Sequence, residues 1–212
     1  MDGRKVNPYE ACERAIRALN RENVELFGRL KMAKWDQVHV IRTVTDVYRK
    51  SAGRAKKRYL GIAFDAYLLA MALCGEEPKK ARKMAEKAIT AAWVDRMLKR
   101  PDDVLLYRFD TETDRKAMRL AESIEVAENV NREIDKALRY WSFQTGQYCI
   151  NFTDYAMMQA YRDAGVETVE WVTQRDERVC ETCGDLDGER FRTEDAPPKQ
   201  HPNCRCYLIP VR

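Results

Sequence analysis

Five side chains that can bind a soft metal ion lie close together near the C-terminus. Cys180 and Cys183 form a C-x-x-C pair in VCETCGD, and HPNCRC contains His201, Cys204 and Cys206. Seventeen residues separate Cys183 from His201. Two pairs with this spacing place four ligands on two turns, in the tetrahedral arrangement that zinc prefers. The spacing therefore predicts a structural zinc site held by Cys180, Cys183, His201 and Cys204.

The fifth side chain, Cys206, leaves the choice of ligands open. If residues 204–206 form a strand, Cys206 points to the same side as Cys204 and can replace either Cys204 or His201. The alternative interpretation is a set of unligated thiols, or a disulfide. The segment from about residue 169 onward has few large apolar residues. A bound metal would therefore stabilise a lobe that is marginal by itself.

Four protein ligands would close the coordination sphere and leave no position for a metal-activated water. A metallonuclease needs a further histidine near the metal, whereas His39, the other histidine, lies far away in a helical pattern. Acidic residues such as Asp110, Glu112 and Asp114 lie at a predicted helix end, where capping explains them. The sequence contains no glycine-rich phosphate loop and no nucleophile motif. We therefore expect that the protein is not an enzyme.

The elements that must position this site are predicted to be helices. Apolar residues recur at steps of three and four through most of the chain, which is typical of amphipathic helices. The first predicted helix begins at Asn7-Pro8. The others extend from about Trp35 to Gly75, from Pro78 to Met97, from Thr111 to Trp141, and from Thr153 or Asp154 to Gly165.

After Gly165 the pattern changes to strands and turns. VETVEWVT is rich in β-branched residues, Asp187-Gly188 is typical of a tight hairpin, and CRCYLIPV is typical of a closing strand. The predicted fold class is mainly α, with a long-helix body at residues 1–165 and a small, zinc-stabilised, β-rich C-terminal lobe at residues 166–212. Without a flexible linker between them, the lobe should pack directly on the body.

Length and composition favour a cytoplasmic, soluble chain. Its 212 residues are enough to bury a sizeable core. MDGRKVNPYE lacks the features of a secretory signal, and no apolar run approaches the roughly 20 residues that span a bilayer. In a reducing compartment, Cys12, Cys74 and Cys149 are most simply isolated thiols in helices.

A basic stretch, YRKSAGRAKKRY, is the best candidate for contact with nucleic acid. It contains no acid, and its basic residues are Arg49, Lys50, Arg54, Lys56, Lys57 and Arg58. On a helix these side chains spread over more than half of the circumference, which favours a solvated face over a narrow binding stripe. Phosphate contact is the alternative interpretation. The body carries a net positive charge and the lobe a small negative one, so any contact with DNA should involve the body.

The C-terminal segment resembles the phage head-morphogenesis family, the minor head proteins that include the Mu F-like group. The resemblance rests on WVTQRDERVCETCGDLDGERF and PPKQHPNCRCYLIP, and the preceding helix is similar to the lead-in of that family. The matching positions are Trp171, Thr173, Asp176, Glu177, Val179, Cys180, Cys183, Leu186, Asp187, Gly188, Pro198, His201, Pro202, Cys204, Arg205 and Cys206.

This resemblance implies a structural protein of the virion, located at the portal vertex or capsid interior and present in the host cytoplasm during assembly. It implies a portal protein and a capsid or scaffold protein as partners, and in some members non-specific contact with double-stranded DNA. No membrane partner is expected. Two alternatives remain, namely a zinc-containing regulatory protein that binds nucleic acid, and a module related to nucleases or toxins.

Overall fold

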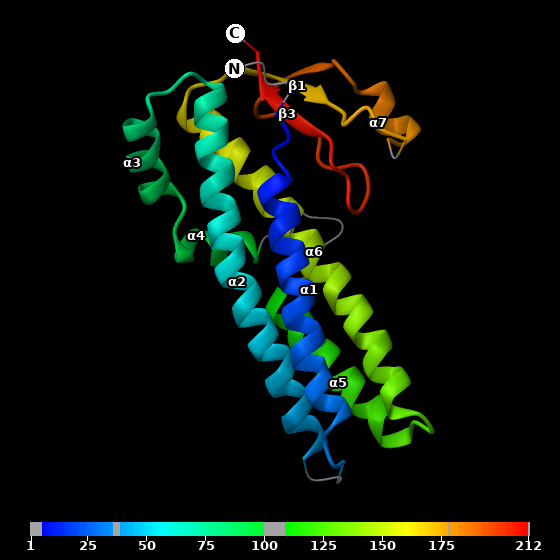
Figure 1. Ribbon diagram of the computed structural model, residues 1–212. Helices are drawn as coiled ribbons and strands as arrows, with labels where there is room; N and C mark the ends of the chain where they lie inside the picture. Colours follow the sequence, from blue (N-terminus) through cyan, green and yellow to red (C-terminus); the bar gives the residue numbers. More distant parts are fainter. Residues whose placement is uncertain (1–5, 36–38, 100–108, 178, 212) are drawn as a thin grey trace.

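The computed structural model describes residues 6–35, 39–99, 109–177 and 179–211 (Figure 1). In these ranges the chain forms long helices and one small sheet. The elements are α1 (Glu10–Lys31), α2 (Val40–Leu73), α3 (Pro78–Ala88), α4 (Ala91–Met97), α5 (Phe109–Val126), α6 (Val130–Asp163), β1 (Thr168–Val172), α7 (Glu181–Asp185), β2 (Arg190–Arg192) and β3 (Tyr207–Pro210).

Four long helices form the body, and α2 packs against α1, α5 and α6 (Figure 1). Aromatic rings fill the space between them. The ring centroids of Tyr48 and Trp141 are 5.0 Å apart, and those of Tyr59 and Phe152 are stacked at 4.9 Å. Such pairs contribute about 0.5–1.5 kcal/mol each beyond their buried area. The body is therefore a packed bundle that can support a site at its end.

Two predicted helices are each divided by a polar cap. The helix predicted from Pro78 to Met97 breaks at Thr90, whose Oγ1 accepts a hydrogen bond from the backbone N–H of Trp93 at 3.2 Å. The helix predicted from Thr111 to Trp141 breaks before Val130, because Asn129 Oδ1 accepts from the N–H of Arg132 at 3.1 Å. Asparagine and threonine at an N-cap stabilise a helix start by about 1 kcal/mol.

The prediction that a short helix begins at Thr153 or Asp154 is wrong. α6 continues through both residues to Asp163. Thr153 Oγ1 donates to the carbonyl of Cys149 at 3.0 Å, one turn earlier, so its hydroxyl bonds within the helix instead of capping it. The predicted end is correct, since Gly165 adopts a positive φ of 69° directly after α6. At the other end of the chain, α1 begins at Glu10 rather than at Pro8, and Asn7 accepts a hydrogen bond from the N–H of Tyr9.

The lobe contains a three-stranded antiparallel sheet in the order β2-β1-β3. A tight hairpin at Asp187-Gly188 is not formed, because residues 173–189, including α7, connect β1 to β2. Gly188 has a φ of 89°, and its N–H donates to the carbonyl of Trp171 at 2.8 Å, so it forms a turn that leads into β2. The closing strand begins at Tyr207, after Cys206.

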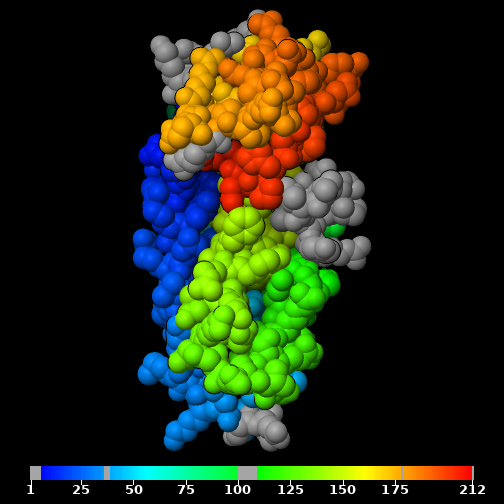
Figure 2. All heavy atoms as spheres, turned by 90° about the vertical axis from the view of Figure 1, so that its right-hand side faces the viewer, coloured from blue at the N-terminus to red at the C-terminus, as the bar shows by residue number. Residues whose placement is uncertain are grey.

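The lobe packs directly on one end of the body (Figure 1, Figure 2). Val169, Val172 and Tyr207 belong to the same buried apolar cluster as the helices. Tyr161 in α6 donates through its hydroxyl to the carbonyl of Leu208 at 2.9 Å. No helix in the described part of the chain meets the length and apolarity that crossing a bilayer requires.

Candidate metal centre

The structure brings all five predicted ligands together around Cys183. Its Sγ lies 3.5 Å from His201 Nε2 and 3.6 Å from Cys204 Sγ. Donor atoms of Cys180, Cys183 and His201 lie within 4.8 Å of one another, and so do those of Cys183, Cys204 and Cys206. Cys183 is therefore common to both groups.

The donors suit a zinc ion. Bonds of about 2.3 Å to sulfur and about 2.0 Å to nitrogen place tetrahedral ligands about 3.5–3.8 Å apart, and both distances from Cys183 meet this requirement. One group consists of two thiols and an imidazole and the other of three thiols, and neither contains a carboxylate. This soft donor set favours zinc over magnesium or calcium. Cys183 and Cys204 are fully buried.

Local backbone structure explains how two turns present these side chains. Cys180 lies at the start of α7, and its carbonyl accepts from the N–H of Gly184 at 2.9 Å, which places Cys183 on the first turn of that helix. In the second turn, the N–H of Cys204 donates to the carbonyl of His201. Asn203 between them has a φ of 58°, a left-handed conformation that asparagine tolerates better than most residues.

The orientation of the imidazole also suits a metal. His201 Nδ1 lies 2.9 Å from the carbonyl oxygen of Pro202, while Nε2 faces Cys183. A proton on Nδ1, donated to that carbonyl, leaves the lone pair of Nε2 for a metal ion. A hydrogen bond of this kind fixes the tautomer and ring orientation of metal-bound histidines.

Without metal, the thiols differ in acidity. The pKa of Cys204 is lowered, mainly by a hydrogen bond from the Cys206 thiol and further by the nearby charge of Lys199. The hydrogen bond to Cys204 and burial raise the pKa of Cys206, and burial raises that of Cys183. The cluster therefore favours one thiolate at Cys204, and a metal ion would have to displace protons from the other thiols.

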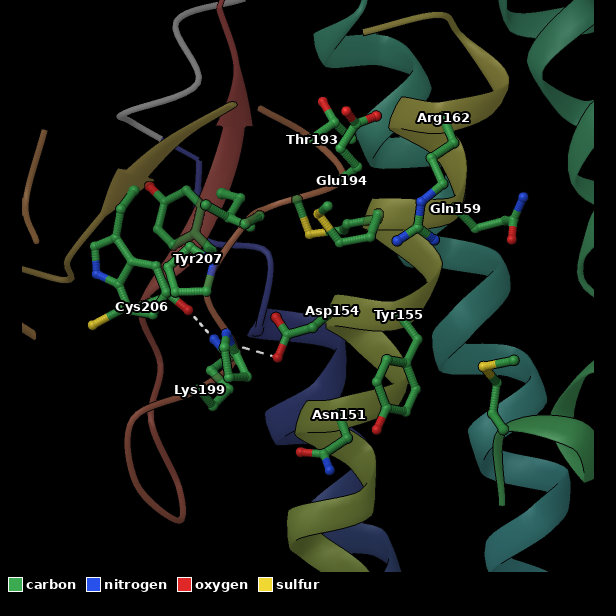
Figure 3. A pocket seen from close by; sticks show the side chains of 18 of the residues that line it. Asn151, Asp154, Tyr155, Gln159, Arg162, Thr193, Glu194, Lys199, Cys206 and Tyr207 are labelled. Atoms are coloured by element: carbon green, nitrogen blue, oxygen red, sulfur yellow. Dashed lines mark hydrogen bonds and ion pairs between the residues drawn. The ribbon is translucent and has the colours of Figure 1, made fainter. Parts of the chain in front are cut away.

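A half-buried polar network that the sequence did not predict joins this cluster to the helices. The Lys199 ammonium contacts Asp154 Oδ2 at 3.3 Å and donates to the carbonyl of Cys206 (Figure 3). The Tyr9 hydroxyl donates to Asp154 Oδ1 and accepts from Lys199, each at 2.5 Å. Burial raises the pKa of Asp154 to about 6, although Lys199 and Tyr9 oppose this shift. No local motif marks these residues, since they come from distant parts of the chain.

The six basic residues predicted to contact DNA lie along α2, and most of them face acidic side chains. The ion pairs are Arg49–Asp114 at 3.3 Å, Lys50–Asp46 at 2.6 Å, Arg54–Glu25 at 3.8 Å, Lys56–Asp110 at 3.0 Å, and Arg58–Glu22. Lys57 is exposed. A phosphate contact at most of these positions would have to replace an existing ion pair.

Among the described residues, other side chains that could do chemistry belong to the helical body. His39 is exposed at the start of α2. Cys12 and Cys149 are buried in α1 and α6, and burial raises the pKa of Cys12 to about 12. Glu112 is buried near the start of α5, where its carboxylate accepts two hydrogen bonds from Arg115 at 2.7 and 2.8 Å. These contacts support structural roles.

Fold and site together define a helical-bundle protein with a C-terminal lobe that carries a cysteine and histidine cluster. Residues 85–209 match the family described as phage Mu protein F like protein. Since this match covers more than half of the chain, the protein belongs to that family, and membership indicates a phage head morphogenesis protein. The match confirms the resemblance of the C-terminal segment and extends it back to α3. No curated protein and no solved structure matches the chain.

Proposed function

We propose that this protein is a structural minor head protein that associates with the portal vertex and inner capsid and assists head assembly. The observation that carries the proposal is the family match, which begins in α3 and includes all five candidate ligands. The cluster contains no carboxylate, and four protein ligands would close the coordination sphere of an ion bound there, which supports a structural role over catalysis. The expected partners are the portal protein and a capsid or scaffold protein.

Within this function, the lobe at residues 166–212 is a zinc-binding unit attached to the helical body at residues 1–165. Cys180, Cys183, His201 and Cys204 hold the ion, and Cys206 is the neighbour that donates a hydrogen bond to Cys204. Zinc supplies a cross-link between the first turn of α7 and the turn before β3. The protein positions the ligands, excludes water from Cys183 and Cys204, and orients the imidazole of His201.

Contact of α2 with packaged DNA is a separate proposal with weaker support. The positive charge of the body favours it, whereas the ion pairs along α2 reduce the charge that is free for phosphate. A regulatory zinc protein would bind a defined duplex without a portal partner. A nuclease would need an open metal position, which a cluster of four or five protein ligands does not favour.

Co-expression with the portal protein of the same phage tests the proposal. We expect the chain to co-purify with the portal ring and to enter heads. Cys183→Ser should reduce incorporation, because the lobe loses a ligand, whereas Cys74→Ser, which changes a half-buried thiol outside the cluster, should not. A folded, zinc-loaded chain that neither binds portal rings nor enters heads would contradict the assembly role.

A further inference from the structure

The short helix α3 carries a row of lysines to which neither the metal cluster nor the family match assigns a role. α3 contains five basic residues and one acid. Lys80 and Arg82 contact acids on the same stretch of chain, at 2.8 and 3.3 Å. The other three basic residues are exposed and have no ion-pair partner among the described residues: Lys79, Lys83 and Lys87.

These three lysines form one stripe along the outer side of α3. They recur every four residues, so they span about 80° of the helix circumference and about 12 Å of its length. Ala81 and Ala85 lie on the opposite face and are buried. α3 packs on α2 at the edge of the bundle (Figure 1). The lysine stripe therefore faces solvent.

Helix stability does not explain the stripe. Like charges four residues apart repel each other. Lys79 also lies in the first turn, where the positive end of the helix dipole disfavours a cation. On α2, by contrast, five of the six basic residues at positions 49–58 have an acid as partner. A polyanion bound along α3 would offset a repulsion that the described part of the chain leaves uncompensated.

The positive surface continues onto α4. Lys87 and Arg96 border the same surface hollow, together with Asp163. The Asp163 carboxylate already accepts hydrogen bonds from Tyr67 at 2.6 Å and from Gln159 at 3.0 Å. Arg96 is exposed, and no acid of the described ranges lies within ion-pair distance of it. An anion along α3 would therefore meet a further cation at this end.

The chemistry of the stripe fits the phosphate backbone of a duplex. Each strand of DNA carries one phosphate per roughly 3.4 Å of helix axis, so a stripe of about 12 Å faces three or four phosphates. The cores of protein interfaces are depleted in lysine. Membrane-bound helices need large apolar side chains beside their lysines, and single strands need aromatic rings for stacking. The exposed face of α3 has no aromatic and no large apolar side chain.

We propose that α3 binds the backbone of double-stranded DNA through Lys79, Lys83 and Lys87, without reading the base sequence. The lysines act as flexible point charges that displace counterions from the phosphates. Arg96 adds a contact where the duplex extends onto α4. This surface is separate from the basic residues of α2, and the proposal does not depend on where the protein lies in a phage head.

The test is fluorescence anisotropy of a labelled duplex of about 25 base pairs, titrated with the full chain at several salt concentrations. Two duplexes of unrelated sequence should bind equally. Replacing Lys79, Lys83 and Lys87 together by Gln should make the slope of log K against log salt shallower by about 2–3. Binding at about 50 mM salt should weaken about tenfold or more. Glutamine has nearly the helix propensity of lysine, so α3 should stay folded, which circular dichroism checks.

A matched control separates the stripe from net charge. Replacing Arg132, Lys136 and Arg139 by Gln removes the same charge from exposed positions of α6. In this variant the slope should change by less than about 1. Neutralising the basic residues of α2 should also change the slope less than the α3 variant does, because most of them already face acids. If the triple α3 variant does not fold, Lys83→Gln alone should reduce the slope by about 1.

The proposal is overturned if the wild-type chain does not bind the duplex at about 50 mM salt, or if the folded α3 variant keeps the wild-type slope. It is also overturned if the α6 control or the α2 variant loses as much as the α3 variant, because the contact would then reflect net charge or lie on α2. Poly-glutamate and vesicles that contain phosphatidylserine serve as competitors at equal charge concentration. If either displaces the labelled duplex as well as unlabelled duplex does, the lysines bind an acidic protein or a membrane, and the DNA proposal is refuted.

Discussion

Cys183→Ser removes the thiol that both groups of candidate ligands share, and its effect can be worked out from the structure. The side chain of Cys183 is fully buried. A serine hydroxyl left unpaired there costs about 1–3 kcal/mol, with or without metal. A metal present at about 1,000 times its dissociation constant adds about 4 kcal/mol to the fold that binds it, and this is lost with binding. We therefore expect a loss of roughly 5–7 kcal/mol in the metal-loaded protein and roughly 1–3 kcal/mol after chelation.

The assay combines elemental analysis with hydrogen exchange. Protein purified without added metal should contain about one zinc per chain, and Cys183→Ser much less. The backbone N–H of Trp171, which donates to the carbonyl of Glu189 at 2.9 Å, reports on the lobe. Amides in the centre of α2 report on the body and should keep their protection. Cys74→Ser is the control for loss of a thiol outside the cluster.

Comparison of the metal-loaded and chelated states shows whether Cys183 stabilises the lobe through zinc or only by packing. If zinc cross-links the lobe, chelation should greatly reduce the difference between wild type and Cys183→Ser. If the difference is the same in both states, Cys183 acts only by packing and the metal assignment is wrong. A metal-free wild-type lobe with full protection would lead to the same conclusion.

Four further predictions follow from the same contacts. Gln147→Leu, which removes the Oε1 acceptor of the Asn203 N–H at 2.5 Å, should weaken zinc binding about 10–100-fold in a chelator competition, while Gln147→Glu keeps an acceptor and most of the affinity. The pKa of Asp154 is raised from 3.8 to about 6 in the folded chain, so the native state binds more protons and stability should fall as pH rises from about 4 to 6. In denaturant unfolding, the free energy of unfolding of wild type relative to Asp154→Asn should fall by roughly 2–3 kcal/mol between about pH 4 and 6. If the difference between the two proteins does not change with pH, the raised pKa of Asp154 is wrong. Neutralising Arg54, Lys56, Lys57 and Arg58 should leave the fold intact and lower DNA association mainly at low salt; a folded variant that fails to enter heads would instead indicate a protein contact. Purified protein should not cleave DNA or RNA with added magnesium, manganese or zinc. Nuclease activity that co-elutes with the protein and is abolished by a single substitution would refute a purely structural role.

The sequence predicted the features that depend on short-range spacing. Cys180 and Cys183 are close because one helical turn joins them, and Gly165 ends α6 because glycine readily adopts a positive φ. The predicted helix boundaries were wrong where they depended on single polar residues. Thr90 and Asn129 break apolar patterns that continue on both sides of them, whereas Thr153 has the same capping chemistry but bonds to its own helix. Only the packing around each residue decides between these outcomes.

Contacts between the lobe and distant residues of the helical body could not be predicted from spacing. They show that the body also stabilises the lobe. Its composition suggested a small unit that is marginal by itself and that a metal would stabilise. In the structure, Asn203 between two candidate ligands is held by Gln147 of α6, and the carbonyl of Cys206 is held by Lys199, which also contacts Asp154 of α6 and Tyr9. The apolar cluster of the body extends through Val169 of β1. The helices therefore hold the second ligand turn in place before a metal binds, and loss of the metal should loosen the first turn, around α7, more than the second.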